Sequence, residues 1–267
     1  MAPCVNERPF TAFHRRRNLP PMSSLTLVGS LLGILLASVL GALPPMLGRW
    51  SDRQLHLFIA FGAGVFLGAV FFHLVPKAIA NHPGNLTNAM ILLGFTVVLL
   101  VERVVLGRPQ SSDEGLGQQR HHVLGISAFV GLSLHSLTEG FALGTGVAAP
   151  QLAAVLVLAI MSHKAVAAFS LATVFRLSNI PRKQAVIMLG VFAGLTPLGA
   201  LLSALLVNAL SLSQTAIPTA LAAGTFIYVA TMDLLPEAFH TGQKRLITFA
   251  ALSLGIFAML AVDWLDV

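Results

Sequence analysis

The fold of this chain is decided by a stretch of sixteen residues that occurs twice. Residues 63–78 read AGVFLGAVFFHLVPKA, and residues 223–238 read AGTFIYVATMDLLPEA. Six of the sixteen positions are identical at a fixed offset of 160, including the second residue, a glycine, and the fourteenth, a proline. Shared alanine and leucine prove little in apolar segments. A glycine and a proline shared twelve residues apart indicate a structural repeat.

The rest of the chain is similarly apolar. Of its 267 residues 56% are hydrophobic and only 10% are charged, with a mean hydropathy of +0.84, whereas about 25% of residues are charged in soluble domains. The composition therefore excludes an ordinary soluble domain and indicates a membrane protein with several spans. The single cysteine, Cys4, lies in the N-terminal tail, which excludes an intramolecular disulfide and a thiolate metal site in the apolar body. The formal charge of +6 does not indicate nucleic acid here, because most cations lie in short links between apolar stretches.

Runs of about 20 mostly apolar residues, the length that crosses a bilayer as a helix, divide the chain into eight predicted spans. The spans are Leu25–Leu47, Leu55–Ile79, Leu86–Leu106, Val123–Ala148, Leu152–Leu177, Ala185–Leu210, Thr215–Ala238 and Leu246–Leu265. The longest link, residues 107–122, is polar and rich in glycine, which predicts a loop. No link has room for a soluble domain, so residues 25–267 are expected to form a single transmembrane domain.

The repeated stretch falls in the second and the seventh span. The seventh span comes five spans after the second, an odd number, so the two copies are expected to cross the membrane in opposite directions. We therefore predict an all-α integral membrane protein with eight transmembrane helices in a 3+2+3 inverted-repeat arrangement. Its repeat halves are residues 25–106 and 185–265, with central helices within residues 123–177. We expect the prolines at 76 and 236 to break their helices near matching ends, and two unrelated proline-kinked helices are the alternative.

Lysine and arginine predict the orientation of the spans. Ten of these cations lie in odd-numbered links, and five lie in even-numbered links and the N-terminal tail. Because the richer side is normally cytoplasmic, both termini are expected outside the cytoplasm. Residues 1–24 form a basic tail that argues for the opposite orientation. It is predicted to be disordered, and a targeting extension or a start at Met22 are alternatives.

Ionisable side chains inside the spans predict the functional site, because each costs at least about 2.5–3.5 kcal/mol at mid-bilayer. His135 and Glu139 lie four residues apart in the fourth span and share one helix face. His163 lies near the centre of the fifth span, at the same predicted depth. Two imidazoles and a carboxylate are ligands that zinc prefers. We predict a metal site of His135, Glu139 and His163, which water or the hydroxyl of Ser136 completes; a structural hydrogen-bonded pair of His135 and Glu139 is the alternative.

Three other polar residues in the spans have two interpretations each. Lys164 adjoins the predicted site, and it either pairs with Glu139 when the site is empty or fills the place of a second metal ion. His73 and Asp233 occupy equivalent positions in the two copies, each three residues before the proline. We predict that they lie at the two openings of an ion pathway. The alternative is that each is an ordinary polar residue at the membrane interface.

These residues carry a family resemblance. HSLTEGFALG from His135 and HKAVAAFSLA from His163 resemble the fourth-span and fifth-span signatures of the ZIP (ZRT/IRT-like protein) family, in its subgroup with His-Lys in the fifth span. GVFLGAVFFHLVP from Gly64, LTPLGALLSALL from Leu195 and GTFIYVATMDLLPEA from Gly224 resemble that subgroup's second, sixth and seventh spans. The resemblance covers nearly the whole chain from about Leu25, with five motifs in the expected order.

The resemblance implies a divalent metal importer that carries mainly Zn2+ by alternating access without ATP hydrolysis. We expect a protein of the plasma membrane whose further cargo ions are Fe2+, Mn2+ or Cd2+. The resemblance implies no enzyme activity and no cofactor, with the metal ion and the bilayer as partners; a homodimer stays an open interpretation. His135, Glu139 and His163 match the family's transport-site positions, and Ser136 matches a position that often holds a polar ligand. Lys164 is where many members have an acidic residue, which resembles a subgroup with one metal ion per site.

The rival interpretation is an intramembrane zinc-dependent hydrolase. Such an enzyme would use histidine and carboxylate ligands to activate a water molecule. Its proteolytic form usually shows H-E-x-x-H on one helix, and the sequence contains neither that string nor G-x-S-x-G. The sequence therefore favours a transporter.

Overall fold

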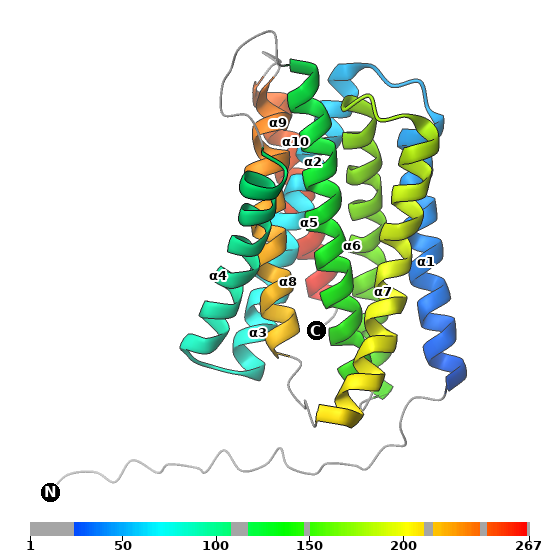
Figure 1. Ribbon diagram of the computed structural model, residues 1–267, viewed down its shortest axis with the longest axis vertical. Coiled ribbons are helices and arrows are strands. Elements are labelled where there is room, and N and C mark those ends of the chain that lie inside the picture. Colours follow the sequence, from blue (N-terminus) through cyan, green and yellow to red (C-terminus); the bar gives the residue numbers. More distant parts are fainter. Residues whose placement is uncertain (1–23, 108–116, 147–149, 211–215, 241–244, 266–267) are drawn as a thin grey trace, which may run out of the picture.

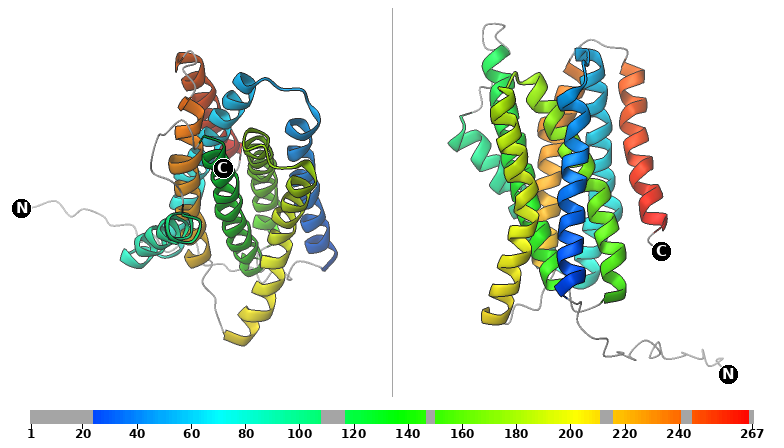
Figure 2. Two further views of the ribbon diagram at one scale, coloured as in Figure 1. Left: turned by 45° about the horizontal axis from the view of Figure 1, so that its top comes forward. Right: turned by 90° about the vertical axis from the view of Figure 1, so that its right-hand side faces the viewer.

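The computed structural model describes residues 24–107, 117–146, 150–210, 216–240 and 245–265. All regular secondary structure in these ranges is helical, and the helices form one elongated bundle (Figures 1 and 2). The helices are α1 (Ser24–Leu47), α2 (Asp52–Gly68), η1 (Ala69–Leu74), α3 (Val75–Asn81), α4 (Asn85–Leu100), η2 (Val101–Val105), α5 (Gly117–Gly146), α6 (Pro150–Leu177), α7 (Arg182–Leu210), α8 (Ala216–Tyr228), η4 (Val229–Leu234), α9 (Leu235–His240) and α10 (Arg245–Leu265). The predicted all-α class is confirmed. The prediction for the tail before Ser24 lies outside the described residues.

The helices follow the predicted spans closely. The second span is the continuous run α2–η1–α3, and the seventh is α8–η4–α9. The largest difference is at α5, which begins at Gly117 rather than at Val123, so it takes up part of the predicted loop. Seven helical runs in the described part of the chain are long and apolar enough to cross a membrane. α6 is a further helix of 28 residues.

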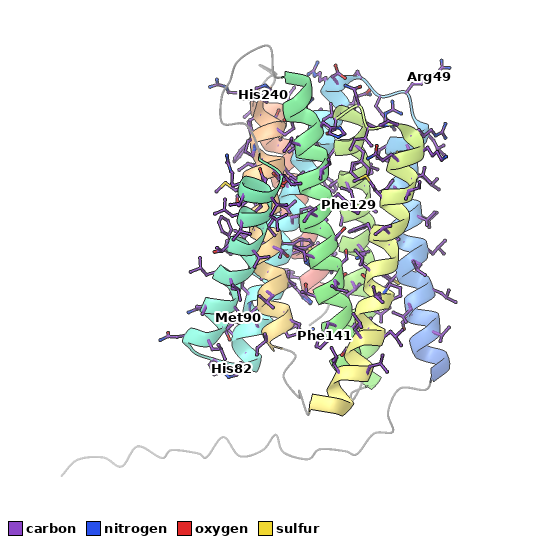
Figure 3. All side chains as sticks on the ribbon, viewed as in Figure 1. Arg49, His82, Met90, Phe129, Phe141 and His240 are labelled. Atoms are coloured by element: carbon purple, nitrogen blue, oxygen red, sulfur yellow. The ribbon has the colours of Figure 1, made fainter. Side chains whose placement is uncertain are left out.

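The exposed and buried side chains are distributed as in a protein surrounded by lipid. Large apolar side chains point outward along the bundle (Figure 3), among them Leu205 at 62% and Phe257 at 64% exposure. Charged and polar side chains such as Lys164 and Asp233 are fully buried instead. Arg49 and His240 lie at one end of the bundle and His82 at the other (Figure 3).

The helices are not broken at the two repeated prolines, contrary to the sequence prediction. Each proline is preceded by a six-residue π-helix, and the two π-helices, η1 and η4, are 160 positions apart. Proline has no N–H and crowds the carbonyl four residues earlier, and the wider π turn accommodates this. The N–H of Val75 bonds to Val70 O, and the N–H of Leu235 bonds to Ala230 O. The chain therefore passes each proline as a continuous helix.

Close helix contacts at glycine also occur in matched pairs. A Cβ atom at Gly64 would lie 2.0 Å from Leu252 O of α10, and a Cβ atom at Gly224 would lie 2.0 Å from Ile91 O of α4. α2 thus packs on α10 as α8 packs on α4. A second set joins α1 to α6 and α7 to α5, through Gly41 on Ala165 O and Gly199 on Leu137 O. In contrast, Gly190 and Gly194 face open space.

Candidate metal centre

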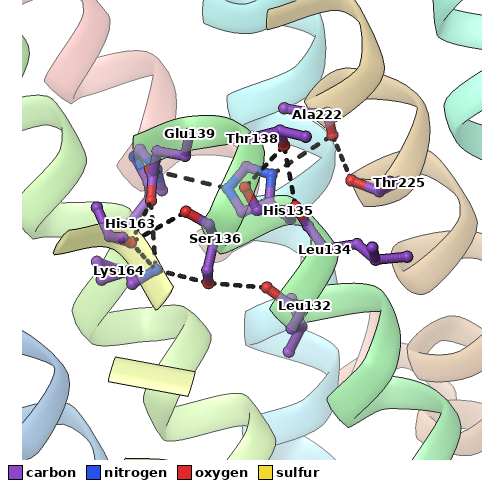
Figure 4. Close-up of polar contacts among 11 residues, drawn as sticks. Leu132, Leu134, His135, Ser136, Thr138, Glu139, His163, Lys164, Ala222 and Thr225 are labelled. Atoms are coloured by element: carbon purple, nitrogen blue, oxygen red, sulfur yellow. Dashed lines mark hydrogen bonds and ion pairs between the residues drawn. The ribbon is translucent and has the colours of Figure 1, made fainter. Parts of the chain in front are cut away.

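The candidate metal centre lies between α5 and α6 (Figure 4). One helical turn on α5 places His135 and Glu139 on the same face, with His135 Nε2 3.8 Å from Glu139 Oε1. From α6, His163 Nε2 contacts the same oxygen. All three residues are buried, and one potential ligand atom from each lies within 4.8 Å of the others. The structure therefore brings together the three residues that the sequence predicted as metal ligands.

Two imidazole nitrogens in this group have no hydrogen-bond partner. His135 Nε2 and His163 Nδ1 are both buried without one among the described residues. The ring of His135 is held in place by Phe226 of α8, which stacks on it with centroids 3.4 Å apart. Its Nδ1 lies 3.4 Å from Ala222 O, at the long limit for a hydrogen bond. Buried polar atoms normally have partners, so nitrogen atoms without one fit a cation-binding role.

Lys164 occupies the other side of the Glu139 carboxylate. Its Nζ donates to Ser136 Oγ and Thr196 Oγ1, both at 2.6 Å, and to Glu139 Oε2 at 3.3 Å. It also lies 4.4 Å from the ring centroid of Phe192, within the range of a cation–π interaction. The two carboxylate oxygens of Glu139 thus have separate roles, one facing the histidines and the other the ammonium group.

Ser136, which the sequence predicted to complete the site, lies beside Lys164. Its hydroxyl donates to Leu132 O at 2.8 Å and accepts from Lys164, so both its donor and an acceptor position are used. Thr196 of α7 completes the lysine's surroundings, and its Oγ1 lies 3.2 Å from Ser136 O. Neither Thr196 nor Phe226 was among the predicted site residues. The LTPLG motif, which contains Thr196, was a sequence signal that could have indicated Thr196. No local pattern indicated Phe226.

His73 and Asp233 lie away from this centre, toward opposite ends of the bundle. His73 is partly buried in η1, next to α3, whereas Asp233 is fully buried in η4, next to α9 (Figure 1). Ser127 Oγ lies 3.1 Å from Asp233 Oδ2 and 3.0 Å from Glu102 Oε2. Tyr228 donates to the same Glu102 oxygen at 2.5 Å. Glu102 was not among the predicted site residues, because a single acid at the end of a predicted span resembles an ordinary interface residue.

Comparison with known proteins identifies the family. The family model described as ZIP zinc transporter matches residues 24–121 and 107–263. Zinc transporter ZIP1 of Takifugu rubripes is 28% identical to this chain, over 89% of the chain and 97% of the relative. Zinc transporter ZIP1 of Bos taurus is 30% identical, over 88% of this chain and 86% of the relative. Zinc transporter ZIP9 of Xenopus tropicalis is 27% identical, over 84% of this chain and 88% of the relative. The chain therefore belongs to the ZIP zinc transporter family and is an integral membrane transporter of metal ions, not an enzyme.

Proposed function

We propose that this protein carries Zn2+ toward the cytoplasm, with His135, Glu139 and His163 as the ligands of the ion in transit. The observation that supports this most is the convergence of two buried imidazoles on one carboxylate oxygen. Nitrogen and oxygen ligands of this kind suit zinc. Fe2+, Mn2+ and Cd2+ are further cargo ions that we infer from the same ligand set.

Lys164 makes the site suited to a single ion that is bound and then released. Its ammonium group lies against Glu139 Oε2 and is fully buried. In the empty site this positive charge balances the carboxylate, which would otherwise be costly to bury. When a cation binds at Glu139 Oε1, the ammonium group of Lys164 repels that cation. The same group also occupies the space beside the carboxylate. We infer one metal ion per site and an affinity that the lysine keeps moderate.

We also propose that the eight spans form a 3+2+3 inverted repeat. Support comes from the two π-helices 160 positions apart and from the matched contacts at Gly64 and Gly224. α3 and α9, which follow the π-helices, lie at opposite ends of the bundle in Figure 1, as opposite crossing directions require. Such repeats let a transporter open a central site to one side at a time.

The direction of transport is proposed from charge. The cations of the odd-numbered links support a cytoplasmic location for the end that carries Arg49, with both termini outside a plasma membrane. Toward this end the ion would pass Asp233, and toward the other end it would pass His73.

A homodimer through α7 is the assembly that we propose. The side of α7 with Gly190 and Gly194 meets nothing within 4 Å of an added Cβ atom, and the neighbouring Val186 and Ile187 are 55% and 57% exposed. Small residues allow close contact between helices in membranes. The oligomeric state of the purified protein in lipid nanodiscs, measured by mass photometry, tests this assembly.

Zinc uptake into proteoliposomes tests the transport proposal. Glu139→Ala and His135→Ala are each expected to abolish uptake of radioactive zinc while the protein is still inserted and purified in the same yield. His122→Ala is a matched control, because His122 is exposed on the same helix as His135. Uptake by either site variant at the wild-type rate would refute the ligand assignment.

A further inference from the structure

A second buried histidine–carboxylate pair joins α2 to α9, at the end of the bundle that carries Arg49 (Figures 1 and 3). His56 of α2 and Glu237 of α9 are each 4% exposed. His56 Nε2 lies 3.5 Å from Glu237 Oε1. A capping box at the start of α2, in which Ser51 and Gln54 bond to one another's backbone N–H groups, fixes the turn that leads into His56. The pair is therefore held by two separate helices and does not depend on a loop.

The tautomer of His56 is set by its own helix. Its Nδ1 lies 2.6 Å from the carbonyl oxygen of Asp52, which can only accept a hydrogen bond. Nδ1 therefore carries the proton, and in the neutral ring Nε2 presents a lone pair toward Glu237. Nε2 is buried and has no hydrogen-bond partner among the described residues. Metal-binding imidazoles commonly have this arrangement, with one nitrogen donating to a carbonyl and the other free to bind the ion.

The separation of the two atoms is compatible with a cation site. An N–H···O hydrogen bond places nitrogen and oxygen about 2.7–3.2 Å apart, which is shorter than the observed 3.5 Å. Two ligands of one tetrahedral zinc ion, each about 2.0–2.2 Å from the metal, are about 3.4 Å apart. The spacing thus matches two ligands of a shared ion.

The pair lies on α2 and α9 at a distance from the central metal site that the helix geometry of α2 gives. Phe66 stacks on Phe226, which in turn stacks on His135, so Phe66 marks the depth of the centre. Ten residues of α2 separate Phe66 from His56, about 15 Å at 1.5 Å per residue. Asp233 lies about one helical turn before Glu237, nearer to the level of Phe226. An ion that leaves the centre toward this end of the bundle therefore meets a carboxylate before it reaches the pair.

We propose that His56 and Glu237 form a second binding subsite for divalent cations, which receives the ion after it leaves the central site. The identity of the cargo rests on the proposed function, but the existence of the subsite does not. With two protein ligands and water molecules to complete the coordination, the subsite binds more weakly than the three-ligand centre. Weak binding near the cytoplasmic opening suits release of the ion.

Zinc binding at equilibrium tests the subsite directly. Purified protein is stripped with a chelator and dialysed against radioactive Zn2+, and the bound metal per chain is counted. The wild type is expected to bind two zinc ions per chain. The Glu139→Ala variant is expected to bind one, at the subsite, and the double variant Glu139→Ala/His56→Ala none. Glu237→Gln keeps the volume of the side chain and is expected to lose the weaker ion in the wild-type background. His240→Ala is the matched control, because His240 is exposed and follows Glu237 on α9 by three residues.

The possible outcomes separate this proposal from the proposed function. If His56→Ala and Glu237→Gln lower the melting temperature but leave the bound zinc unchanged, the pair is a structural ion pair and the subsite is refuted. If the wild-type protein fails to transport zinc, yet His56→Ala and Glu237→Gln each bind one ion fewer than the wild type, the transport proposal fails and the subsite stands. Retention of the weaker ion by the Glu139→Ala/His56→Ala variant also overturns the subsite.

Discussion

Phe66 and Phe226 lie ring on ring, with centroids 4.7 Å apart and planes inclined by 11°. The two residues are equivalent in the repeated stretch, 160 positions apart. In an inverted repeat, two equivalent residues can contact each other only where the two-fold axis that relates the halves passes between them. Because Phe226 also stacks on His135, the proposed axis runs beside the candidate metal centre. The same aromatic ring thus links the two halves to a residue of that centre.

Phe226→Ala is expected to weaken both zinc binding and stability. The substitution removes the ring that orients His135 and leaves a cavity, and large-to-small changes at buried phenylalanine cost about 3–5 kcal/mol in soluble cores. Zinc affinity from equilibrium dialysis and the melting temperature in detergent provide the two measurements. Phe257→Ala is the control, because Phe257 is 64% exposed. Equal effects of the two substitutions would contradict the role given to Phe226.

Lys164→Met is expected to tighten zinc binding and slow its release. Methionine keeps most of the volume but removes the positive charge beside Glu139 Oε2. We expect the KM for zinc to fall by at least tenfold, about 1.4 kcal/mol, with a lower maximal rate. Initial rates of uptake into proteoliposomes measure both quantities. Lys183→Met, at an exposed position near the start of α7, should change neither, and an unchanged KM in Lys164→Met would show that the lysine does not tune affinity.

Ser136→Ala separates two roles for the serine hydroxyl. Because Ser136 accepts from Lys164 and donates to Leu132 O, its loss should lower stability by about 1–3 kcal/mol and leave the KM for zinc nearly unchanged. A metal ligand would show the reverse. Thermal unfolding and zinc uptake are measured together. Ser133→Ala is the matched control, since the hydroxyl of Ser133 has no hydrogen-bond partner among the described residues and its removal should be neutral.

Gly64→Ala and Gly224→Ala are expected to destabilise the protein to a similar extent. At each position the new methyl group would lie 2.0 Å from a carbonyl oxygen of the neighbouring helix, so α10 or α4 must move away. Gly29→Ala meets nothing within 4 Å and should leave the melting temperature unchanged in detergent. A tolerated alanine at Gly64 or Gly224 would contradict the close packing described for these helix pairs.

The sequence by itself determined the helices and the three residues of the candidate metal centre. Apolar runs long enough to cross a bilayer are a local property, so the spans could be located without knowledge of their neighbours. His135 and Glu139 are one helical turn apart, which fixes their shared face. The cost of burying charge then pointed to His163, at the same depth in the next span.

Only the tertiary structure decided which atoms of these residues meet. The division of Glu139 between the histidines and Lys164, the position of Thr196, and the stacking of Phe226 depend on how each helix is rotated against its neighbours. The same holds for His56 and Glu237, which are 181 positions apart and carry no shared motif. Hydropathy sets where a helix begins and ends, but contacts between side chains on different helices are set by packing, which a single sequence pattern does not encode.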